Sequence, residues 1–152
     1  MCGILGEFTF DSSLIEKATF LKLLELSRNR GPDCQKYFSN NKNFQFGFNR
    51  LSILDITDLA NQPIQSHNKR FTMVYNGEIY NYKEIRKILQ KNSFNIKSTG
   101  DTEVLVNAFS FFGIDETINM LDGMFAIALF DNRNQSINLI RDFAGIKPLY
   151  YA

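Results

Sequence analysis

Cys2 has the most direct potential for chemistry in this chain, because of its position. Its small side chain predicts removal of the initiator methionine, which leaves a thiol and a free α-amine on one Cα. An α-amine titrates at about 7.7–8.0, so near neutral pH it can act as a base beside the thiol. Cys2 thus combines a nucleophile with a general base and needs no histidine. The alternative is an ordinary cysteine at a frayed terminus, but the apolar segment 3–10 predicts a strand that anchors this end.

Asn76 and Gly77 allow two interpretations. Asn-Gly after the apolar segment 71–75 is typical of a type I′ hairpin turn, and taken alone the turn is the simpler interpretation. The functional alternative is an oxyanion hole, with the Asn76 amide and the Gly77 N–H directed at one oxygen. A glycine would suit that role because it has no Cβ to obstruct close approach. The polar residues just after Gly77 would make a poor return strand.

Arg50 and Asp101 are candidates for holding an amino acid. A guanidinium group can clamp a carboxylate through two parallel hydrogen bonds, and a carboxylate can receive an ammonium group. The simpler alternatives are a solvated arginine for Arg50 and a helix N-cap for Asp101. Spacing alone does not decide between these alternatives.

The remaining candidate residues indicate no metal or cofactor chemistry. His67 is the only histidine, which excludes a two-histidine metal site, and its polar loop predicts a solvated side chain. Cys34 follows a turn without a companion ligand and is expected to be structural. Neither a Walker-type phosphate loop nor a dinucleotide-binding fingerprint occurs. We therefore predict no metal and no cofactor for this site.

The composition predicts one folded domain over residues 1–152. Hydrophobic residues make up 44% and charged residues 22% of the 152, values ordinary for a globular protein. A net charge of +1 offers no electrostatic basis for a nucleic-acid or membrane partner. The chain has no 18-residue apolar segment and no secretory signal, and its two cysteines do not form a disulfide framework. We expect reduced thiols and a cytoplasmic location.

Hydrophobic periodicity predicts a layered α+β fold rather than a doubly wound sheet. In 44–48, phenylalanines alternate with polar residues, which predicts a strand with one buried face. The alternation reverses at Arg50, which suggests a bulge or a redirected side chain. The other expected strands are 3–10, 71–75, 124–130 (buried on both faces) and 136–141 after a turn at 131–135, and the expected helices are 14–26, 82–90 and one that Asp101 opens. Residues 150–152 still have strand-like sequence, so we expect a longer polypeptide.

Seven ordered segments resemble the N-terminal glutaminase domain of glutamine-hydrolysing asparagine synthetases. They are MCGILG at 1–6, RGPD at 30–33, RLSILD at 50–55, NGEIYN at 76–81, GDTE at 100–103, GMFA at 123–126 and RDFAGIKPLYY at 141–151. The resemblance covers essentially the whole chain. It departs from the family at Asn29, where the family usually has histidine, and at Phe48 and Asn49, near which histidine is common.

The resemblance implies a class II glutamine amidotransferase with a four-layer α/β/β/α sandwich of the N-terminal-nucleophile hydrolase type, here without its last strands. Cys2 matches the family nucleophile, and Asn76 and Gly77 match its oxyanion hole. The positions that match glutamine-binding residues, or lie between them, are Arg50, Leu51, Ser52, Ile53, Leu54, Asn76, Gly77, Glu78 and Asp101. The implied reaction is hydrolysis of L-glutamine to glutamate and ammonia through a γ-glutamyl thioester.

The implied partner is a synthetase domain, in cis or in trans, that makes asparagine from aspartate. ATP and Mg²⁺ are expected only there, because these residues contain no Ser-Gly-Gly-x-Asp pyrophosphate loop. Two alternatives stay open: a sugar or nucleotide precursor as the ammonia acceptor, and a non-catalytic binding module on the same fold, which the replaced histidines motivate. The oligomeric state is also open, with a homodimer as one alternative.

Overall fold

The chain folds into two antiparallel sheets with helices outside them. The computed structural model describes residues 2–11 and 13–152. Sheet A has the order β1-β3-β2 and sheet B the order β4-β5-β6-β7. The elements in chain order are β1 (Gly3–Phe8), α1 (Lys17–Glu25), η1 (Arg28–Arg30), β2 (Cys34–Ser39), β3 (Phe44–Arg50), η2 (Asp58–Ala60), β4 (Ile64–Gln65), β5 (Phe71–Ile79), α2 (Tyr82–Lys91), α3 (Thr102–Phe112), α4 (Ile114–Met120), β6 (Gly123–Asp131) and β7 (Ser136–Arg141).

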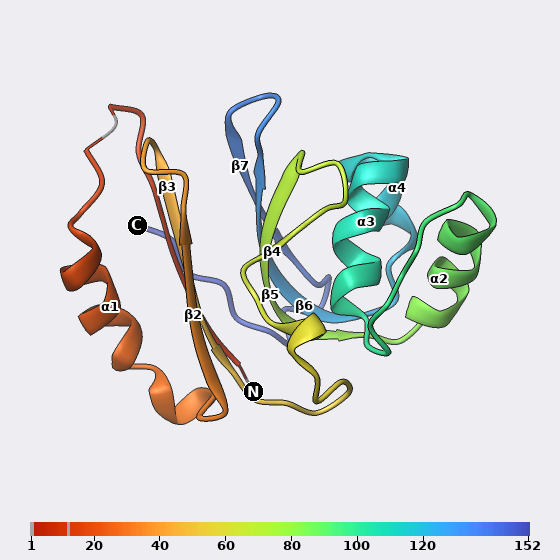
Figure 1. Ribbon diagram of the computed structural model, residues 1–152, viewed down its shortest axis with the longest axis horizontal. Coiled ribbons are helices and arrows are strands. Elements are labelled where there is room, and N and C mark those ends of the chain that lie inside the picture. The colour runs from red at the N-terminus through yellow and green to blue at the C-terminus, as the bar shows by residue number, and fades with distance from the viewer. Residues whose placement is uncertain (1, 12) are drawn as a thin grey trace.

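The two sheets lie face to face, with α1 on the outer face of sheet A and α2, α3 and α4 on the far side of sheet B (Figure 1). Two hydrophobic clusters fill the spaces between these parts. One joins β5 and β6 to α2 and α3, and the other joins the phenylalanines of β3 to Val74, Ala128 and Phe130 across the space between the sheets. The predicted layered α+β class is confirmed, and strands β1, β5, β6 and β7 and the three predicted helices occur within a few residues of the expected bounds.

Strand β5 corrects one of the two interpretations of Asn76-Gly77. The strand continues through both residues to Ile79, where Asn76 pairs with Ala126 and Gly77 with Phe125. The hairpin turn is therefore wrong, because the pairing partner is β6, about 50 residues further along the chain. Local turn propensity is overridden here by this long-range ladder.

Strand β3 differs from its prediction in two ways. Every residue from Phe44 to Arg50 is buried, so the strand has no solvent face. On its outer face, Asn49 donates to the Leu24 carbonyl of α1 at 2.8 Å, and Gln45 donates to the Ile15 carbonyl just before that helix at 3.1 Å. Gly47 lets the helix approach, since a Cβ would lie 2.7 Å from Leu24 Cδ2. The strand also runs without a bulge to Arg50 and ends there, so the change of alternation marks the end of the strand.

Several elements were not predicted from the sequence. Strand β2, with its modest apolar pattern, completes sheet A beside β3, and the two-residue β4 lies on the edge of β5. Helix α4 and the short helices η1 and η2 were also missed. Conversely, residues 150–152 form no strand, contrary to the expectation from their sequence.

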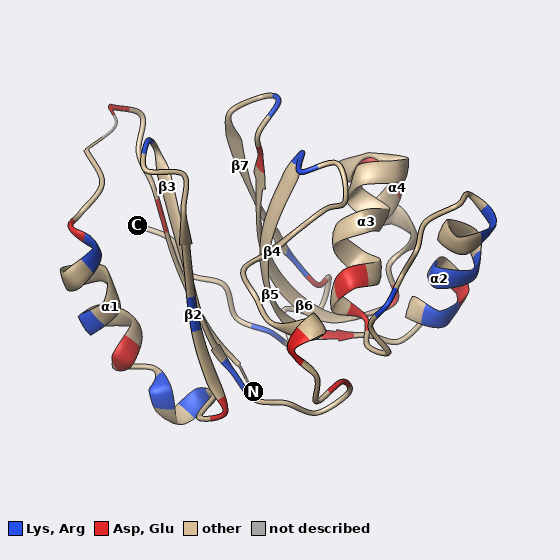
Figure 2. Cartoon of the chain, viewed as in Figure 1, with Lys and Arg blue, Asp and Glu red and all other residues tan. Residues whose placement is uncertain are grey.

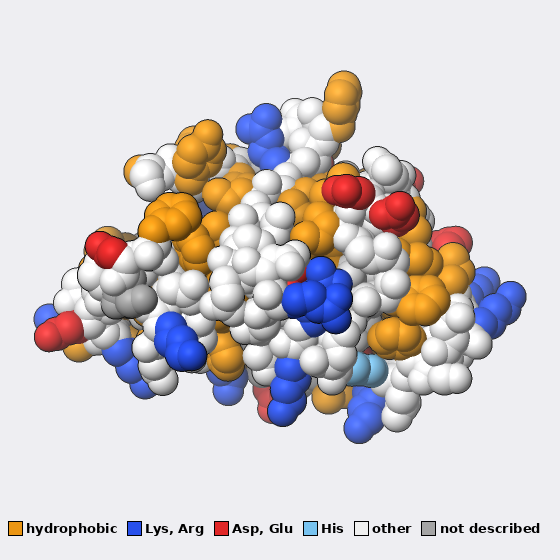
Figure 3. All heavy atoms as spheres, turned by 90° about the horizontal axis from the view of Figure 1, so that it is seen from above, with side chains coloured by type: hydrophobic (Ala, Val, Ile, Leu, Met, Phe, Trp, Pro, Cys, Tyr) orange, Lys and Arg blue, Asp and Glu red, His pale blue; other side chains and the backbone are white. Residues whose placement is uncertain are grey.

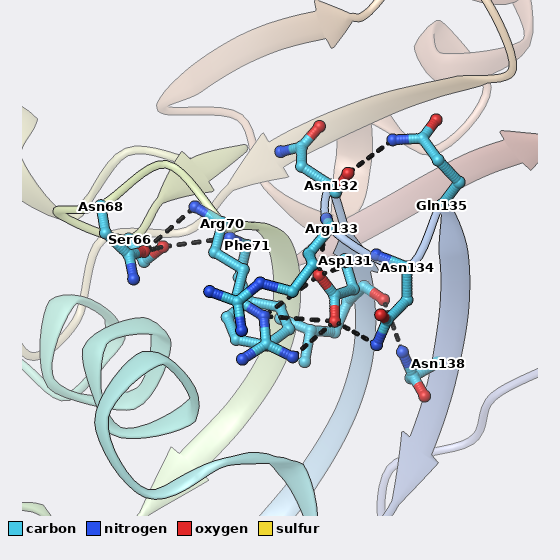
Figure 4. Close-up of polar contacts among 11 residues, drawn as sticks. Ser66, Asn68, Arg70, Phe71, Asp131, Asn132, Arg133, Asn134, Gln135 and Asn138 are labelled. Atoms are coloured by element: carbon cyan, nitrogen blue, oxygen red, sulfur yellow. Dashed lines mark hydrogen bonds and ion pairs between the residues drawn. The ribbon is translucent and has the colours of Figure 1, made fainter.

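The β6–β7 turn is held to β5 by one buried carboxylate (Figure 4). Asp131, whose side chain is fully buried, accepts hydrogen bonds from Arg70 Nη2 at 2.8 Å, Arg133 N at 2.9 Å and Asn134 Nδ2 at 3.0 Å. Burial alone would raise the pKa of Asp131, but these bonds and the charge of Arg70 outweigh it and lower the pKa. The ionised form of Asp131 therefore stabilises the fold.

We expect Asp131→Asn to lower the free energy of unfolding at pH 7 by about 2 kcal/mol, because hydrogen bonds to a buried charge are lost. A carboxyl whose folded pKa is lowered contributes stability above its unfolded pKa of about 3.9, and loses it as pH falls through the folded pKa. The difference in free energy of unfolding between wild type and Asp131→Asn should therefore decrease below about pH 4. Urea denaturation from pH 7 to pH 3 measures it, with exposed Asp122→Asn as the control. A gap independent of pH contradicts this account.

The surface at the end that carries the β6–β7 turn is mixed. Hydrophobic side chains reach it in several groups separated by polar atoms (Figure 3). Within the described part of the chain, every helix is too short or too polar to cross a membrane.

Candidate active site

Cys2 lies directly before β1 and is held against the end of β3. Its Sγ is 3.3 Å from the Leu51 backbone N, which is placed to donate to it, and its carbonyl accepts a hydrogen bond from Arg30 Nε at 3.2 Å. The residue is partly buried and packs against the cluster between the sheets. The predicted removal of Met1 lies outside the described residues. The terminus at Cys2 is therefore anchored, because both its side chain and its backbone have partners in the fold.

A cavity of about 180 Å³ opens beside Cys2. This is smaller than the roughly 300–1,000 Å³ of pockets for drug-sized ligands, so it suits a molecule the size of an amino acid. It is lined by Cys2, Phe48, Arg50, Leu51, Ile53, Leu54, Asp55, Ala60, Gln62, Tyr75, Asn76, Gly77, Glu78, Gly100, Asp101, Thr102, Met124 and Lys147. Of the predicted site residues, all but Ser52 line the cavity.

Strand alternation brings residues of both sheets to this cavity. Arg50 has the parity of Phe46 and Phe48 on β3, whose side chains face sheet B. Asn76 has the parity of Val74 on β5, whose side chain faces sheet A. Both polar side chains therefore extend into the space between the sheets, at the end where its hydrophobic filling stops. Cys2 joins them there because β1 pairs with β3, with Gly3 opposite Asn49.

Asn76 presents its amide to the cavity. The residue is only 6% exposed, yet its side chain forms no hydrogen bond with any other residue of 2–11 and 13–152. A buried amide normally has partners, so an unpaired one beside a cavity indicates a place for a polar ligand atom. The amide group supplies two N–H donors for that purpose.

The Gly77 N–H points toward the cavity edge of β5. Phe125, the residue paired with Gly77, uses both of its backbone groups on the other side, donating to Asp142 Oδ2 at 3.2 Å and accepting from Asp142 N at 2.8 Å. In an antiparallel ladder the backbone groups of Gly77 then face away from β6. Strand β4 pairs only with Thr72 and Met73 and does not reach this point. The N–H is therefore open to the cavity.

Glycine at position 77 is required by the neighbouring strand. A Cβ there would lie 2.2 Å from the Met124 carbonyl oxygen and 2.7 Å from Phe125 Cα. The close approach that the sequence suggested for a substrate is thus made by the backbone of β6. Gly77 brings β6, and with it Met124, up to the cavity wall.

Arg50 is 6% exposed, so a solvated surface arginine is ruled out. Its Nη1 donates to the Thr57 carbonyl at 2.7 Å and to Asn61 Oδ1 at 2.8 Å, and its Nη2 donates to the Asp55 carbonyl. These three bonds hold the segment 51–61 against the end of β3. Among the residues that the structure describes, the Nε N–H and the second N–H of Nη2 have no partner, which leaves two guanidinium donors for an anion.

Asp55 connects the segment 51–61 to the loop before α3. The Asp55 carboxylate accepts hydrogen bonds from Thr57 N at 2.8 Å and Thr99 N at 2.7 Å. Burial alone would raise the pKa of Asp55, but the hydrogen bonds outweigh it and hold the pKa well below its usual range. The ionised side chain therefore joins the two loops that border the cavity, the one before η2 and the one before α3.

Asp101 precedes α3, but its side chain does not cap the helix. Its Oδ2 instead accepts hydrogen bonds from the Tyr75 hydroxyl at 2.7 Å and from Ile79 N at 3.0 Å. Asp101 therefore occupies the N-cap position of α3, but its side chain turns to β5, which supplies better-placed donors. The loop that carries Asp101 is fixed by Arg86 of α2, which donates to the Ser98 and Gly100 carbonyls at 2.6 and 2.7 Å. Lys and Arg predominate on α2, as Figure 2 shows.

The structure separates some predicted residues from the cavity. The backbone N–H of Ser52 donates to Asp33 Oδ2 at 2.7 Å, and Ser52 lies outside the lining. Asn29 is exposed on η1, whereas Phe48 contributes its buried ring to the wall. His67 is exposed, as predicted, but its Nε2 lies 3.4 Å from Glu103 Oε1, and Cys34 is unpaired on β2. In the described residues no group of three or more His, Cys, Asp or Glu could hold a metal ion.

Sequence reasoning assigned no role in the site to several lining residues, among them Gln62, Tyr75, Met124 and Lys147. Tyr75 stands beside the NGEIYN segment and Met124 lies within the GMFA segment, but both were interpreted as core residues because apolar neighbours surround them in the sequence. Gln62 donates to the Tyr75 carbonyl at 3.1 Å and accepts from Tyr75 N at 2.6 Å, a contact without a sequence signal. Lys147 lies in the segment 141–151 that carries the resemblance, yet no role had been assigned to it.

Comparison with known proteins identifies the family to which this chain belongs. The sequence model of a family described as a glutamine amidotransferase domain matches residues 1–152. The chain belongs to the class II glutamine amidotransferase domain family. Relatives of this amidotransferase domain include asparagine synthetase [glutamine-hydrolyzing] 2 of Bacillus subtilis (strain 168), 38% identical over 99% of this chain and 20% of that protein. Another is asparagine synthetase [glutamine-hydrolyzing] 1 of Arabidopsis thaliana, 35% identical over 99% of this chain and 25% of that protein.

The amidotransferase domain thus spans about a fifth to a quarter of these relatives. Among solved structures it resembles glutamine phosphoribosylpyrophosphate amidotransferase from B. subtilis, with a TM-score of 0.53 and 18% identity over 66% of this chain and 24% of that one. It also resembles the allosteric regulatory enzyme of purine biosynthesis, with a TM-score of 0.57 and 19% identity over 70% of this chain and 25% of that one. At this identity the likeness concerns the fold.

Proposed function

We propose that this domain hydrolyses the side-chain amide of L-glutamine, with Cys2 as the nucleophile. The observation that carries the proposal is the shared cavity: the Cys2 thiol, the unpaired Asn76 amide and the charged groups of Arg50 and Asp101 all line one space of about 180 Å³. A nucleophile, an oxyanion donor and grips for both charged ends of an amino acid are the parts that such a hydrolysis needs.

Glutamine would bind with its charged end away from Cys2. The two open N–H groups of Arg50 suit the α-carboxylate, and the carboxylates of Asp101 and Glu78 suit the α-ammonium. Leu51, Ile53 and Leu54 would enclose the methylene groups of the substrate. This arrangement directs the side-chain amide to Cys2.

The chemistry would proceed in two halves. The α-amine of processed Cys2 takes the thiol proton, and the thiolate attacks the amide carbon of glutamine. Asn76 Nδ2–H and Gly77 N–H stabilise the negative oxygen of the tetrahedral intermediate. The C–N bond then breaks, and the nitrogen leaves as ammonia with the proton held by the α-amine. Water attacks the γ-glutamyl thioester with the same amine as base, which releases glutamate and restores the thiol.

The fold and the acceptor follow from the same proposal. We assign the four-layer α/β/β/α sandwich of the N-terminal-nucleophile hydrolase type, since Cys2 directly precedes β1, a strand of one of the two stacked sheets. The ammonia would serve ATP-dependent asparagine synthesis from aspartate by a synthetase domain in cis or in trans, because the relatives include asparagine synthetases. ATP and Mg²⁺ would belong to that domain, and the glutaminase site needs neither.

The test is glutamate formation from glutamine by the Met1-processed protein, together with labelling by a glutamine-like diazoketone. We expect turnover without ATP or metal and one adduct, on Cys2, with mass analysis showing that Met1 is absent. Retained Met1 with no turnover and no adduct would favour a non-catalytic module on this fold. Turnover with an acceptor other than aspartate in the complete enzyme would change the acceptor and leave the glutaminase step standing.

A further inference from the structure

The hydroxyl of Tyr75 lies between the hydrophobic core and the cavity. Tyr75 is 3% exposed and belongs to the cluster between sheet B and α3, but its ring also lines the cavity. Its hydroxyl donates to Asp101 Oδ2 at 2.7 Å, and Ile79 N donates to the same oxygen at 3.0 Å. Two donors on β5 therefore occupy one oxygen of a carboxylate that is itself 4% exposed.

The other carboxylate oxygen of Asp101 is much less engaged. Within the described residues, Oδ1 has only a weak contact with Thr102 Oγ1, at 3.4 Å. Because a carboxylate is planar, fixing Oδ2 on β5 also fixes the direction of Oδ1. A buried carboxylate with one saturated and one nearly unused oxygen is suited to receive a cation on the unused side.

We propose that Tyr75 is a positioning residue, which holds Asp101 so that Oδ1 receives the α-ammonium of the bound amino acid. The proposal rests on the proposed glutaminase function and extends it to amino-acid selectivity. A neutral hydroxyl orients the carboxylate and leaves its negative charge uncompensated. A lysine or arginine in its place would neutralise that charge. Asp101 thereby keeps its negative charge for the ligand.

Three features keep Tyr75 in this role. Burial, reinforced by the charge of Asp101, raises the pKa of Tyr75 well above its ordinary value, so the hydroxyl remains a donor at physiological pH. The Gln62 side chain holds both backbone groups of Tyr75, because it accepts a hydrogen bond from the N–H and donates one to the carbonyl. The ring is packed in the core, so the hydroxyl has one fixed direction.

The test compares two ligands on two proteins. Glutaramate is glutamine without its α-ammonium group. A difference between the affinities for the two ligands therefore reports on that group alone. In a Cys2→Ala background, where no turnover interferes, we expect Tyr75→Phe to weaken glutamine binding roughly tenfold and glutaramate binding less than twofold. In the Cys2-containing protein, Tyr75→Phe should raise KM for glutamine with kcat nearly unchanged. Calorimetry measures the binding, and a coupled glutamate assay measures the kinetics.

The matched control is Tyr37→Phe. The Tyr37 hydroxyl donates to Gln45 Oε1 at 2.8 Å on the α1 side of sheet A, remote from the cavity lining. Tyr37→Phe also removes a tyrosine hydroxyl oxygen, and it should leave the affinities for both ligands unchanged. Equal weakening of glutamine and glutaramate by Tyr75→Phe would overturn the proposal in favour of a general structural role, and so would no weakening of either.

A second variant covers failure of the first. If Tyr75→Phe does not melt cooperatively, Asp101→Asn is compared on the same two ligands, and an unchanged preference for glutamine overturns the proposal. The outcome for the underlying function is separate: a Cys2→Ala protein that binds neither ligand, together with an inactive Cys2 protein, refutes the glutaminase itself.

Discussion

Replacing Cys2 with alanine should reduce glutamate formation by a factor of roughly 10⁴ or more, because removing a catalytic nucleophile leaves only binding and oxyanion stabilisation. The structure leads us to expect little damage to the fold. Cys2 is partly buried, and its anchoring bond from Arg30 goes to the backbone carbonyl, which alanine keeps. Glutamine binding, measured by calorimetry, should stay within about threefold.

The control for this variant is Cys34→Ala. Cys34 is the other thiol of the chain, lies on β2 and does not line the cavity, so its loss should leave activity intact. The diazoketone adduct should disappear from Cys2→Ala and persist in Cys34→Ala. Equal rates for wild type and Cys2→Ala would end the proposed mechanism, whatever the labelling shows.

Asn76→Ala should lower kcat by about 10²–10³ with a much smaller change in KM, the loss expected when one oxyanion donor is removed. The reason is specific to this structure. The Asn76 amide lies in the cavity wall and has no partner in the described part of the chain, so its loss breaks none of the hydrogen bonds described there. The effect on the free energy of unfolding should therefore be small, about 1 kcal/mol or less.

Steady-state kinetics and thermal melting together check this prediction. Asn138→Ala on β7 is a suitable control, since it removes an amide from the same sheet, where it donates to the Leu129 carbonyl at 3.5 Å. Asn138 lies outside the cavity lining and should leave kcat unchanged. A normal kcat in Asn76→Ala, or a loss confined to KM, would assign Asn76 to binding instead of to the oxyanion.

The sequence was most informative where the chemistry is contained in one residue or one short segment. Cys2 could be proposed as the nucleophile because removal of Met1 would leave a thiol and an α-amine on the same Cα, and no folding is needed to bring these two groups together. Helix α2 and strand β6 were predicted because their apolar patterns are long and regular. The family followed from seven ordered segments, and the match over residues 1–152 confirms it.

The sequence was ambiguous where local and long-range hydrogen bonding compete. Asn-Gly is a good turn, and Asp before a helix is a good cap, so local rules favoured the structural alternatives for Asn76-Gly77 and Asp101. The structure decides otherwise because the partners lie far along the chain: β6 for Gly77 and the Tyr75 hydroxyl for Asp101, 26 residues away. The polar face of β3 was misjudged for the same reason, since α1 supplies acceptors that no alternation pattern reveals.

By itself, therefore, the sequence determined the family and the layered fold class, and it singled out Cys2 as the proposed nucleophile. Only the tertiary structure decided which residues share the cavity: it includes Gln62, Tyr75 and Lys147, and it leaves Ser52 outside. The physical reason is that side-chain direction depends on strand parity, and a cavity depends on which strands of two sheets end at the same place. Parity can be read along one strand, but the stacking of two sheets becomes visible only when the chain is folded.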